Sequence, residues 1–432
     1  MTAPIPRNEI SSDQIIIHIL NLYSEKNMNS KAIIFLGDGM ADSPLEELDN
    51  RTPLEYARTP AMDSIAAAGC SGTFLTLPVG LPTSSDVANM SVLGLHPEHN
   101  YPGRGPIEAV SQDIVLGPDD VAWRCNLVNV SDDGVLKDFS AGHIPDDRSH
   151  KLMAALQERF GSDEVTFHAG VSYRNLLVLH GRRFSDRVKY FKPDSSQDMH
   201  IGQLRLSPAD DSPEAAETVK FLIDLEEKAA GFLAAHPLNS GVDVPANRIW
   251  PWSPGRRPKL RKFSEIYSGR RGAIISAVDV IKGIAKCTDM TVIDVPGATG
   301  FLDTNYAGKA AAAVEAIRDF DLVYLHIEAI DECSHIGDLN LKLRAIEDFD
   351  AKIVAPVLDA LKGKAGMNFA VLPDHPVPIH LRKHTTTPVP VAMCGTSFVP
   401  DEVTCFSERA ARRGDLGFMA GEDIVRKVLE LA

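Results

Sequence analysis

One run of apolar residues constrains the fold of this chain more than any other feature. It is KAIIFLG at Lys31–Gly37, and its unbroken apolar character before a glycine is typical of a strand buried on both faces of a sheet. Comparable runs recur along the chain, and segments with helical spacing separate them. This alternation predicts an α/β fold with a doubly wound, mostly parallel sheet. Further strands are expected at 72–77, 273–278, 290–295, 321–327, 368–372 and 389–394, and helices at 61–68, 306–318, 339–361 and 421–431.

The middle of the chain has a different pattern. A long helix is predicted to begin at Ser212-Pro213, because a serine N-cap precedes proline at the first helical position, and to end near Ala235. Residues 237–262 are rich in proline, tryptophan and arginine without clear periodicity, which indicates a linker or a lid. Before the long helix, short strands are expected within 120–180, for example at Val165–His168 and Asn175–His180.

These patterns predict a sheet domain that is interrupted by an inserted α+β domain over 120–270. The sheet domain would then comprise residues 31–119 and 271–432, with hinges near 118–122 and 268–274, where glycines allow bending. Residues 1–30 are expected to form an N-terminal extension, and Met28 is a candidate for the natural first residue.

The composition and net charge of the chain indicate which kinds of binding partner are disfavoured. The chain has 432 residues, 44% of them hydrophobic, and a net charge of -15, which disfavours nucleic acid or an anionic membrane as the main partner. An anionic substrate would need a local basic pocket. None of the six cysteines forms a CxxC pair and no run is long enough to span a bilayer, so we expect a cytoplasmic protein. The sequence leaves open whether it forms a homo-oligomer.

Four clusters of residues are candidates for a catalytic or metal-binding site. Three of them follow predicted strands, and the fourth, with Ser85, lies in a turn that leads into a helix. Singly, each has a structural explanation as a helix cap or a surface pair. Together they are more informative, since the carboxyl ends of parallel strands meet at one edge of a sheet. The candidate metal ligands are Asp38, Ser85, Asp331, His335, Asp374, His375 and His384.

Carboxylate and imidazole ligands suit zinc, manganese or cobalt better than calcium. This set is large enough for two metal ions, and two ions about 4 Å apart can clamp a phosphoryl group. A serine hydroxyl in contact with one ion can become a nucleophile near neutral pH without a histidine base. The sequence therefore predicts phosphoryl transfer to Ser85.

Several motifs in order resemble those of the alkaline phosphatase superfamily. Within it, the chain is most similar to the archaeal-type cofactor-independent phosphoglycerate mutases, from Met28 onward. The motifs include GDGMAD (37–42), SDVANMSVLG (85–94), GRGPIEA (103–109), GATGFLDTNY (297–306), DECSH (331–335) and PDHPVP (373–378).

The resemblance implies interconversion of 2- and 3-phosphoglycerate through phosphorylated Ser85, without bisphosphoglycerate. It also implies two divalent ions (Mn, Mg, Co or Zn) and an insert whose basic residues hold a small phosphorylated substrate. One ion would be held by Asp38, Ser85, Asp374 and His375, and the other by Asp331, His335 and His384.

Basic side chains are the candidates for binding this substrate, because the arginine fork matches phosphate and carboxylate. We favour Arg104 and Arg174 as catalytic residues, and Lys282 could stabilise the transferring phosphoryl charge, although it could equally be a surface helix residue. Arg256 and Arg257 could instead be a solvated charge run. The remaining substrate-binding candidates are Arg124, His143, Arg256, Arg257 and Arg271.

Two departures from the family pattern concern the substrate. Residues 192–198 read KPDSSQD, with Gln197 where relatives carry a histidine, and TTTP at 385–388 replaces a Thr-Gly-Asp-Pro segment. Both leave the metal ligands intact. The alternatives are therefore a homoserine kinase-like phosphotransferase or a metal-dependent phosphatase of the same superfamily, and a non-catalytic protein is the least favoured.

Overall fold

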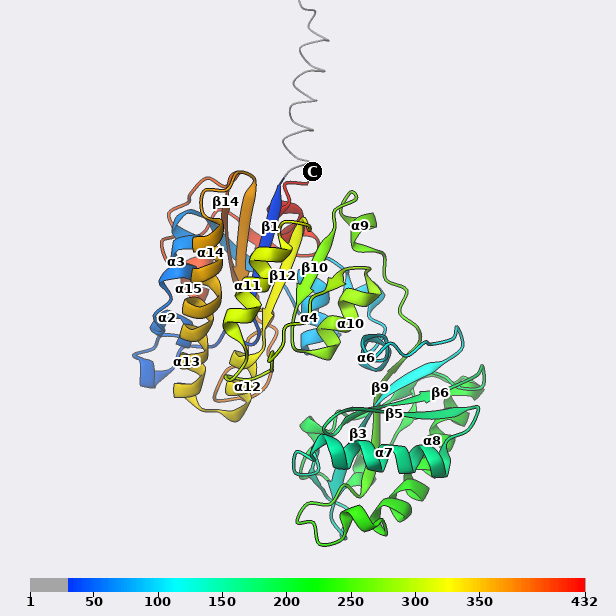
Figure 1. Cartoon of the computed structure of the whole chain (residues 1–432). Coiled ribbons are helices and arrows are strands. Elements are labelled where there is room, and N and C mark those ends of the chain that lie inside the picture. The colour runs from blue at the N-terminus through cyan, green and yellow to red at the C-terminus, as the bar shows by residue number, and fades with distance from the viewer. Residues whose placement is uncertain (1–29, 432) are drawn as a thin grey trace, which may run out of the picture. The chain divides into compact units, whose positions relative to one another are not determined.

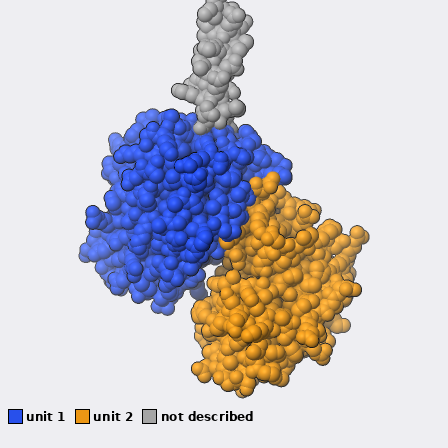
Figure 2. All heavy atoms as spheres, viewed as in Figure 1, with its two compact units in different colours: residues 1–98, 262–278, 290–432 blue, residues 99–261, 279–289 orange. Residues whose placement is uncertain are grey.

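The computed structural model describes residues 30–431, so the predictions for residues 1–29 lie outside the described part. The chain divides into two compact units, which Figure 1 shows as ribbons and Figure 2 colours separately. Unit 1 comprises residues 1–98, 262–278 and 290–432, and unit 2 comprises residues 99–261 and 279–289. These bounds differ from the predicted insert at 120–270, because helix α6 (Arg104–Ser111) packs on strand β3 (Val121–Val130) and helix α10 (Asp279–Cys287) packs on α6.

Unit 1 is built on an eight-stranded sheet with the order β11-β10-β12-β1-β13-β14-β2-β15. Its central strand β1 is parallel to both neighbours, as the unbroken apolar run predicted. Strand β14 is antiparallel to both of its neighbours. The predicted mostly parallel α/β fold is therefore confirmed. The strands are β1 (Lys31–Gly37), β2 (Gly69–Phe74), β10 (Gly272–Ile275), β11 (Thr291–Val292), β12 (Leu322–Ile327), β13 (Met367–Leu372), β14 (Val389–Gly395) and β15 (Gly417–Met419).

Helices cover both faces of this sheet. Ile33 and Phe35 point to one face, where they join a core cluster with apolar residues of α3, α11, α12, α13 and α14. Tyr324 of β12 points to the other face, where its hydroxyl meets Asn89 of α4. The helices of unit 1 are α2 (Pro53–Tyr56), α3 (Pro60–Ala67), α4 (Ser85–Val92), α9 (Phe263–Ile266), α11 (Tyr306–Ala316), α12 (Ala329–Ile336), α13 (Leu339–Phe349), α14 (Ala355–Leu361), α15 (Glu408–Ala411) and α16 (Asp423–Val428), with a 3-10 turn η1 (Glu46–Leu48).

The helix predicted at 339–361 is not continuous. A π-helical turn, η5 (Asp350–Val354), separates α13 from α14, and Pro356 follows it. Proline cannot donate the backbone hydrogen bond of a regular helix, which favours such an irregularity. The turn has a structural use, because the Asp350 carboxylate accepts hydrogen bonds from the amides of Ala61 (3.2 Å) and Met62 (2.7 Å) at the start of α3.

Unit 2 contains a second, antiparallel sheet in which β3 pairs with both β6 and β9. The predicted long helix is confirmed as α8 (Pro213–Ala234), capped by Ser212. Unit 2 begins within the short helix α5 (Pro97–Asn100). Its other elements are β4 (Leu136–Asp138), α7 (Asp146–Phe160), β5 (Val165–Val171), β6 (Arg174–Leu179), β7 (Val188–Lys189), β8 (Ser207–Pro208), β9 (Arg248–Gly255) and 3-10 turns η2 (Asp194–Ser196), η3 (Ile201–Gln203) and η4 (Pro237–Asn239).

The prediction of a linker or lid at 237–262 was wrong, because strand β9 lies within it. Pro251 concealed the strand pattern, since proline donates no ladder hydrogen bond. An edge strand tolerates it, and β9 pairs only with β3 among the described strands. Trp250 and Trp252, on either side of the proline, are 8% and 6% exposed, so this strand is part of the core of unit 2.

Among the described helices, none combines the length and the apolar composition that crossing a membrane requires.

A buried ion pair ties two loops of unit 1 to helix α13. Lys342 Nζ lies 2.7 Å from Asp42 Oδ2 and donates a second hydrogen bond to the Val377 carbonyl at 2.9 Å. Both charged side chains are fully buried. The Asp42 carboxylate also accepts the Ile379 amide at 3.1 Å. The pair therefore joins the loop after β1 to the loop after β13.

Removing one partner of this pair should be costly, because the other charge would stay buried without compensation. We predict that Lys342→Met lowers the free energy of unfolding by about 3–5 kcal/mol in urea titrations. The control is Arg318→Met, which removes an exposed ion pair to Glu315 and should cost less than about 1 kcal/mol. Equal effects of the two substitutions would contradict the importance of the buried pair.

Candidate metal centre at the sheet edge

All the predicted metal ligands except Ser85 follow three neighbouring strands of unit 1. Asp38 directly follows β1, Asp331 lies in α12 after β12, and Asp374 and His375 follow β13. Because β12, β1 and β13 are adjacent and parallel, their carboxyl ends meet at one edge of the sheet. The sheet order therefore explains why residues more than 300 positions apart in sequence form one cluster.

Gly39 makes the close approach of these loops sterically feasible. Its φ angle is +64°, a conformation that glycine adopts without strain. A Cβ atom at this position would lie 2.7 Å from Asp331 Oδ1, so a side chain would displace the carboxylate. The Gly39 amide also donates a hydrogen bond to Asp374 Oδ1 at 3.1 Å. The GDGM motif thus joins the loops that follow all three strands.

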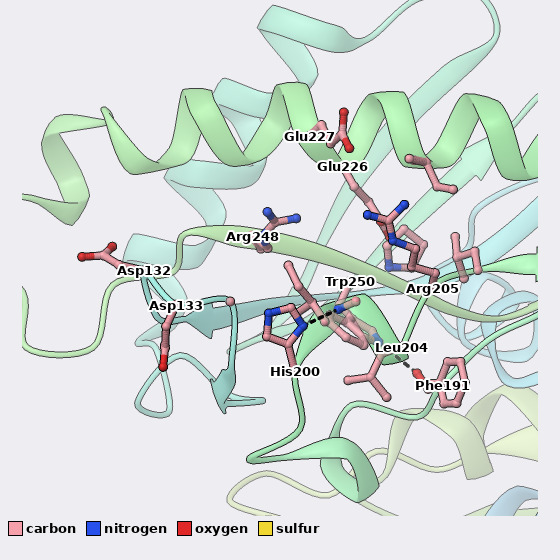
Figure 3. Close-up of a pocket in the computed structure, with 16 residues that line it drawn as sticks. Asp132, Asp133, Phe191, His200, Leu204, Arg205, Glu226, Glu227, Arg248 and Trp250 are labelled. Atoms are coloured by element: carbon pink, nitrogen blue, oxygen red, sulfur yellow. Dashed lines mark hydrogen bonds between the residues drawn. The ribbon is translucent and has the colours of Figure 1, made fainter.

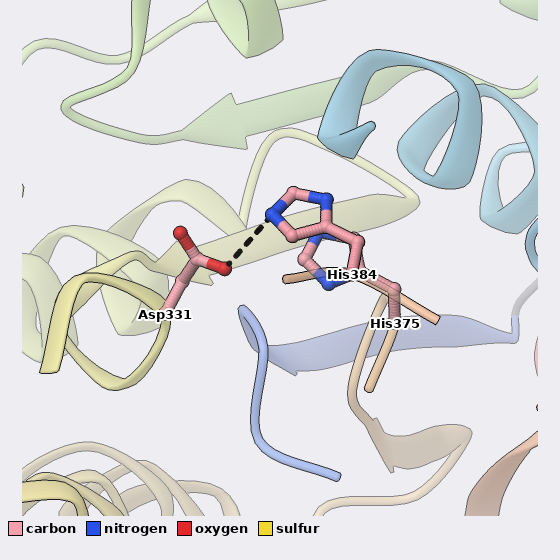
Figure 4. Close-up of side chains that lie close together, drawn as sticks. All are labelled: Asp331, His375 and His384. Carbon is pink, nitrogen blue, oxygen red and sulfur yellow. Dashed lines mark ion pairs between the residues drawn. The ribbon is translucent and has the colours of Figure 1, made fainter. Parts of the chain in front are cut away.

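Asp331 and two histidines form one half of the cluster. Asp331 and His335 are four residues apart in α12, so the helix places them on the same face. His335 Nε2 lies 3.4 Å from Asp331 Oδ2. Figure 4 shows the contact of His384 Nε2 with Asp331 Oδ1, at 3.5 Å. The two imidazole Nε2 atoms are 2.9 Å apart. Ring nitrogens that approach this closely are arranged as they would be around a shared cation.

The other half of the cluster contains the candidate nucleophile. Ser85 is the first residue of α4, and its Oγ atom lies 3.1 Å from His375 Nε2. The same Nε2 atom lies 3.4 Å from both Asp38 Oδ1 and Asp374 Oδ2. The His375 ring stacks on the His384 ring with centroids 3.8 Å apart, which connects the two halves (Figure 4). All seven residues that the sequence predicted as metal ligands therefore lie in one cluster.

His326 is a member of the cluster that sequence reasoning missed. Its Nε2 atom lies 3.0 Å from Asp38 Oδ2, and its Nδ1 atom lies 3.1 Å from Ser276 Oγ. It stands inside the apolar run of β12 and was read as part of a buried strand. No local pattern in the sequence marks it, because its contact with Asp38 follows from the register of the sheet, which places His326 beside Leu36, two residues before Asp38.

The potential metal ligands can be grouped by the proximity of their donor atoms. One group of potential metal ligands is Asp331, His375 and His384, and the other is Asp38, His326 and Asp374. In each group the donor atoms lie within 4.8 Å of one another. His375 Nε2 also lies 3.4 Å from both Asp38 Oδ1 and Asp374 Oδ2, so this side chain is within reach of both groups, and the resemblance assigned it to the same ion as Asp38.

The electrostatics of the site reflect several buried carboxyl groups. Burial, followed by the charges of Asp374, Glu328 and Asp331, raises the pKa of Asp38 well above its usual value. Burial likewise raises the pKa of Asp374 to about 7 and that of Glu328 to about 8. These groups resist ionisation together because their charges repel at short range in a medium of low dielectric.

Histidines balance part of this charge. Burial alone would raise the pKa of Asp331, but hydrogen bonds from His335 and His384 hold it well below its usual value. Burial opposes the charging of His335, yet the hydrogen bond and charge of Asp331 raise its pKa to about 9. His326 behaves in the opposite way, because burial and the charge of Lys309, a fully buried residue of α11, lower its pKa to about 3.

The residues present fit divalent metal ions. Asp38 Oδ1 and Asp331 Oδ1 are buried, and among the described residues they have only long contacts with imidazoles, to His375 Nε2 at 3.4 Å and to His384 Nε2 at 3.5 Å, and no hydrogen bond of regular geometry. Buried carboxylate oxygens without donors are costly unless a cation satisfies them. Oxygen and imidazole ligands together suit manganese, cobalt or zinc.

A hydrogen-bond relay fixes the helix that carries Ser85. Asn89, one turn later in α4, donates from Nδ2 to the Ser85 carbonyl at 2.7 Å and to Asp374 Oδ2 at 2.9 Å. The Tyr324 hydroxyl donates to Asn89 Oδ1 at 2.5 Å. Asn89 and Tyr324 are fully buried. The relay therefore holds the serine relative to a metal-ligand loop.

Unit 2 contains a separate cluster of arginines around one carboxylate. Glu108 Oε1 lies 2.7 Å from Arg104 Nε and 2.5 Å from Arg124 Nη1. Arg124 is 2% exposed and stacks on Trp252 at 5.1 Å, while its Nε atom has no hydrogen-bond partner among the described residues. Two guanidinium groups against one carboxylate leave a net positive charge. Arg174 contributes further, since its charge, with that of Arg104, adds to burial in lowering the pKa of Arg124.

The other basic candidates have different surroundings. Lys282 lies in α10 of the same unit, close enough for its charge to act on Asp279. Arg256 donates to the Asp119 and Phe184 carbonyls at 2.9 and 2.8 Å, which indicates a structural role. Exposed Arg257 has no ion pair within the described residues, and exposed His143 packs edge-on against Tyr173.

Arg271 was predicted to bind substrate, but its position contradicts that assignment. It precedes β10, at the amino-terminal end of the parallel strands, whereas the metal-ligand cluster lies at their carboxyl ends. Its amide donates to Asp321 Oδ2 at 2.7 Å and its guanidinium group to the Asp319 carbonyl. Its contacts explain it as a residue that fixes the loop before β12.

Known proteins were compared with the chain. The sequence family described as 2,3-bisphosphoglycerate-independent phosphoglycerate mutase matches residues 66–239. A protein of that name from Methanosarcina acetivorans is 43% identical over 93% of this chain and 100% of its own length. Another from Methanothrix thermoacetophila is 44% identical over 92% of this chain and 99% of its own length.

Solved structures similar to this chain were also found. The PH0037 protein from Pyrococcus horikoshii superposes with a TM-score of 0.77 at 27% identity, covering 93% of this chain and 98% of that one. The cofactor-independent phosphoglycerate mutase from Thermoplasma acidophilum superposes with a TM-score of 0.62 at 27% identity, covering 93% and 99%. The resemblance seen in the sequence motifs is thereby confirmed, and the chain belongs to the family of 2,3-bisphosphoglycerate-independent phosphoglycerate mutases.

Proposed function

We propose that the chain interconverts 2- and 3-phosphoglycerate through a phosphoserine formed on Ser85, with two divalent ions held at the sheet edge. The observation that carries this proposal is the position of Ser85 Oγ, 3.1 Å from His375 Nε2 inside a cluster of buried carboxylates and imidazoles. The names of the similar proteins support the reaction, and the residue types support the metal ions.

The proposed reaction has two symmetrical halves. Ser85 Oγ loses its proton and bonds to phosphorus while the bond to the 3-oxygen of glycerate breaks and that oxygen takes a proton. The 2-hydroxyl then loses a proton and its oxygen bonds to phosphorus, while the bond to Oγ breaks and Oγ takes up a proton again. When bound, the ions would lower the pKa of the attacking hydroxyl and neutralise phosphoryl charge. Asn89 and Tyr324 keep Ser85 in place during both halves.

We propose that the arginine cluster of unit 2 binds the anionic groups of the substrate. Glu108 orients Arg104 and Arg124, and the buried Arg124 Nε, which has no hydrogen-bond partner among the described residues, could donate to a phosphate or carboxylate oxygen. Arg174 and Lys282 add positive charge nearby. This cluster supplies the local basic pocket that the acidic chain needs.

Manganese, magnesium, cobalt or zinc would satisfy the ligand set, with the mixed nitrogen and oxygen donors favouring the transition metals and zinc. We place the protein in the cytoplasm, because all six cysteines are free thiols as expected in a reducing compartment.

The reaction can be tested with purified protein, Mn²⁺ and 3-phosphoglycerate, with the product coupled to enolase. We predict turnover, and we predict that Ser85→Ala lowers it by roughly a thousandfold or more, since the nucleophile is lost. The control is Ser91→Ala in the same helix, whose hydroxyl only donates to the Val87 carbonyl. This variant should keep a rate close to that of the wild type.

Other outcomes would favour the alternative functions. Release of inorganic phosphate alone would indicate a phosphatase, and ATP-dependent phosphorylation of homoserine would indicate a kinase-like enzyme. Near-normal turnover in Ser85→Ala would contradict the phosphoserine pathway.

The hydrogen bonds from Tyr324 through Asn89 to Ser85 can be tested by measuring kcat in a variant that lacks the first of them. We predict that Tyr324→Phe lowers kcat about tenfold with little change in KM, because losing one hydrogen bond loosens Asn89 without removing a substrate contact. Bound metal and thermal stability should be close to those of the wild type. The control is Tyr306→Phe, since the buried Tyr306 hydroxyl makes no hydrogen bond among the described residues. An unchanged kcat in Tyr324→Phe would count against the relay.

A further inference from the structure

A second cavity lies within unit 2, between edge strand β9, helix α8 and turn η3 (Figure 3). Its volume is about 370 Å³, at the lower end of the range for small-molecule sites. All its lining residues belong to unit 2, and none of them is a metal ligand or a proposed substrate contact. The residues that matter chemically are Arg205, Arg248, Glu226, Trp250 and Ile223.

Five charged side chains that line this cavity have no hydrogen bond or ion pair within the described residues, namely Asp132, Arg205, Glu226, Glu227 and Arg248, of which Asp132, Arg205 and Glu227 are exposed. Elsewhere in the same unit, Arg183 pairs with both Glu164 and Glu217. Glu226 is half-buried, and burial, opposed by Arg248 and aided by Glu227, raises its pKa to about 8. Two cations and one half-buried carboxyl group therefore face the cavity with their hydrogen-bonding capacity unused.

One wall of the cavity is apolar and fixed. The Trp250 indole is 8% exposed, and its Nε1 donates to the Phe191 carbonyl at 2.9 Å (Figure 3). Leu204 belongs to the same buried apolar cluster as Trp250, and Leu206 and Ile223 also line the cavity. A preformed apolar wall next to unpaired charges is typical of sites for small amphipathic ligands.

We propose that this cavity binds a free amino acid with an apolar side chain. Its carboxylate would bind Arg205 and Arg248, its ammonium group would bind the Glu226 carboxylate, and its side chain would pack against Trp250. A simple organic anion would leave Glu226 without a partner, and a simple amine would leave both arginines without one. A zwitterion satisfies all three groups, and bidentate binding of carboxylate is the contact that arginine favours.

The proposal can be tested by isothermal titration calorimetry of the full chain with three matched probes. These are phenylalanine, 3-phenylpropanoate, which lacks the amino group, and 2-phenylethylamine, which lacks the carboxylate. We predict that phenylalanine binds about tenfold or more tightly than either. Glu226→Gln should abolish its advantage over 3-phenylpropanoate, and Arg248→Gln should abolish its advantage over 2-phenylethylamine.

Glu158→Gln, at an exposed position of α7 outside the cavity, is the matched control and should bind phenylalanine like the wild type. Circular dichroism and mutase turnover of each variant show whether it is folded, independently of binding. Three results would overturn the proposal: no binding of phenylalanine or leucine at about 10 mM, equal affinity for all three probes, or unchanged phenylalanine binding in both cavity variants.

Discussion

Repulsion among buried carboxyl groups is the interaction on which the site depends. Asp38, Asp374, Asp331 and Glu328 converge where three parallel strands end, and burial and mutual charge raise the pKa of all but Asp331. Such a cluster is unfavourable in a folded protein unless positive charge offsets it. The histidines supply part of that charge at Asp331. Divalent ions would supply the rest of the positive charge. Because the ions would relieve the repulsion between the carboxylates, their binding would stabilise the folded state.

The surrounding structure holds these groups together against their repulsion. Gly39 permits the close approach of the loop after β1 to Asp331, which follows β12. The Lys342–Asp42 pair fixes the loops after β1 and β13. Asn89 then connects the nucleophile helix to Asp374. Each contact is buried and involves backbone or a fixed side chain, so the donor atoms are positioned before any ion or substrate arrives.

Much of the fold and the candidate metal site could be predicted from the sequence, for a physical reason. Strands buried on both faces need unbroken apolar runs, and their ends are then marked by the first polar residue, as Asp38 marks the end of β1. The same rule hid His326, because it is a polar residue inside such a run, and its partner Asp38 is 288 positions away.

The errors have similar causes. Strand β9 was missed because Pro251 interrupts its pattern, and the π-helical turn at Asp350 depends on a contact with α3 that no local pattern reveals. Arginines were the least predictable group. Arg124, Arg256 and Arg271 look alike in sequence, but one pairs with Glu108 while the other two bond to backbone carbonyls. Their roles depend on tertiary partners rather than on residue type.

The metal content of the protein tests the central claim most directly. After loading with Mn²⁺ and removal of the excess, mass spectrometry of the metal together with anomalous diffraction should show two ions per chain. One should lie beside Asp38 and Asp374 and the other beside Asp331 and His384, and Asp38→Asn should lower the ratio toward one. A wild-type chain that keeps no ion, or ions bound away from these side chains, would contradict the account.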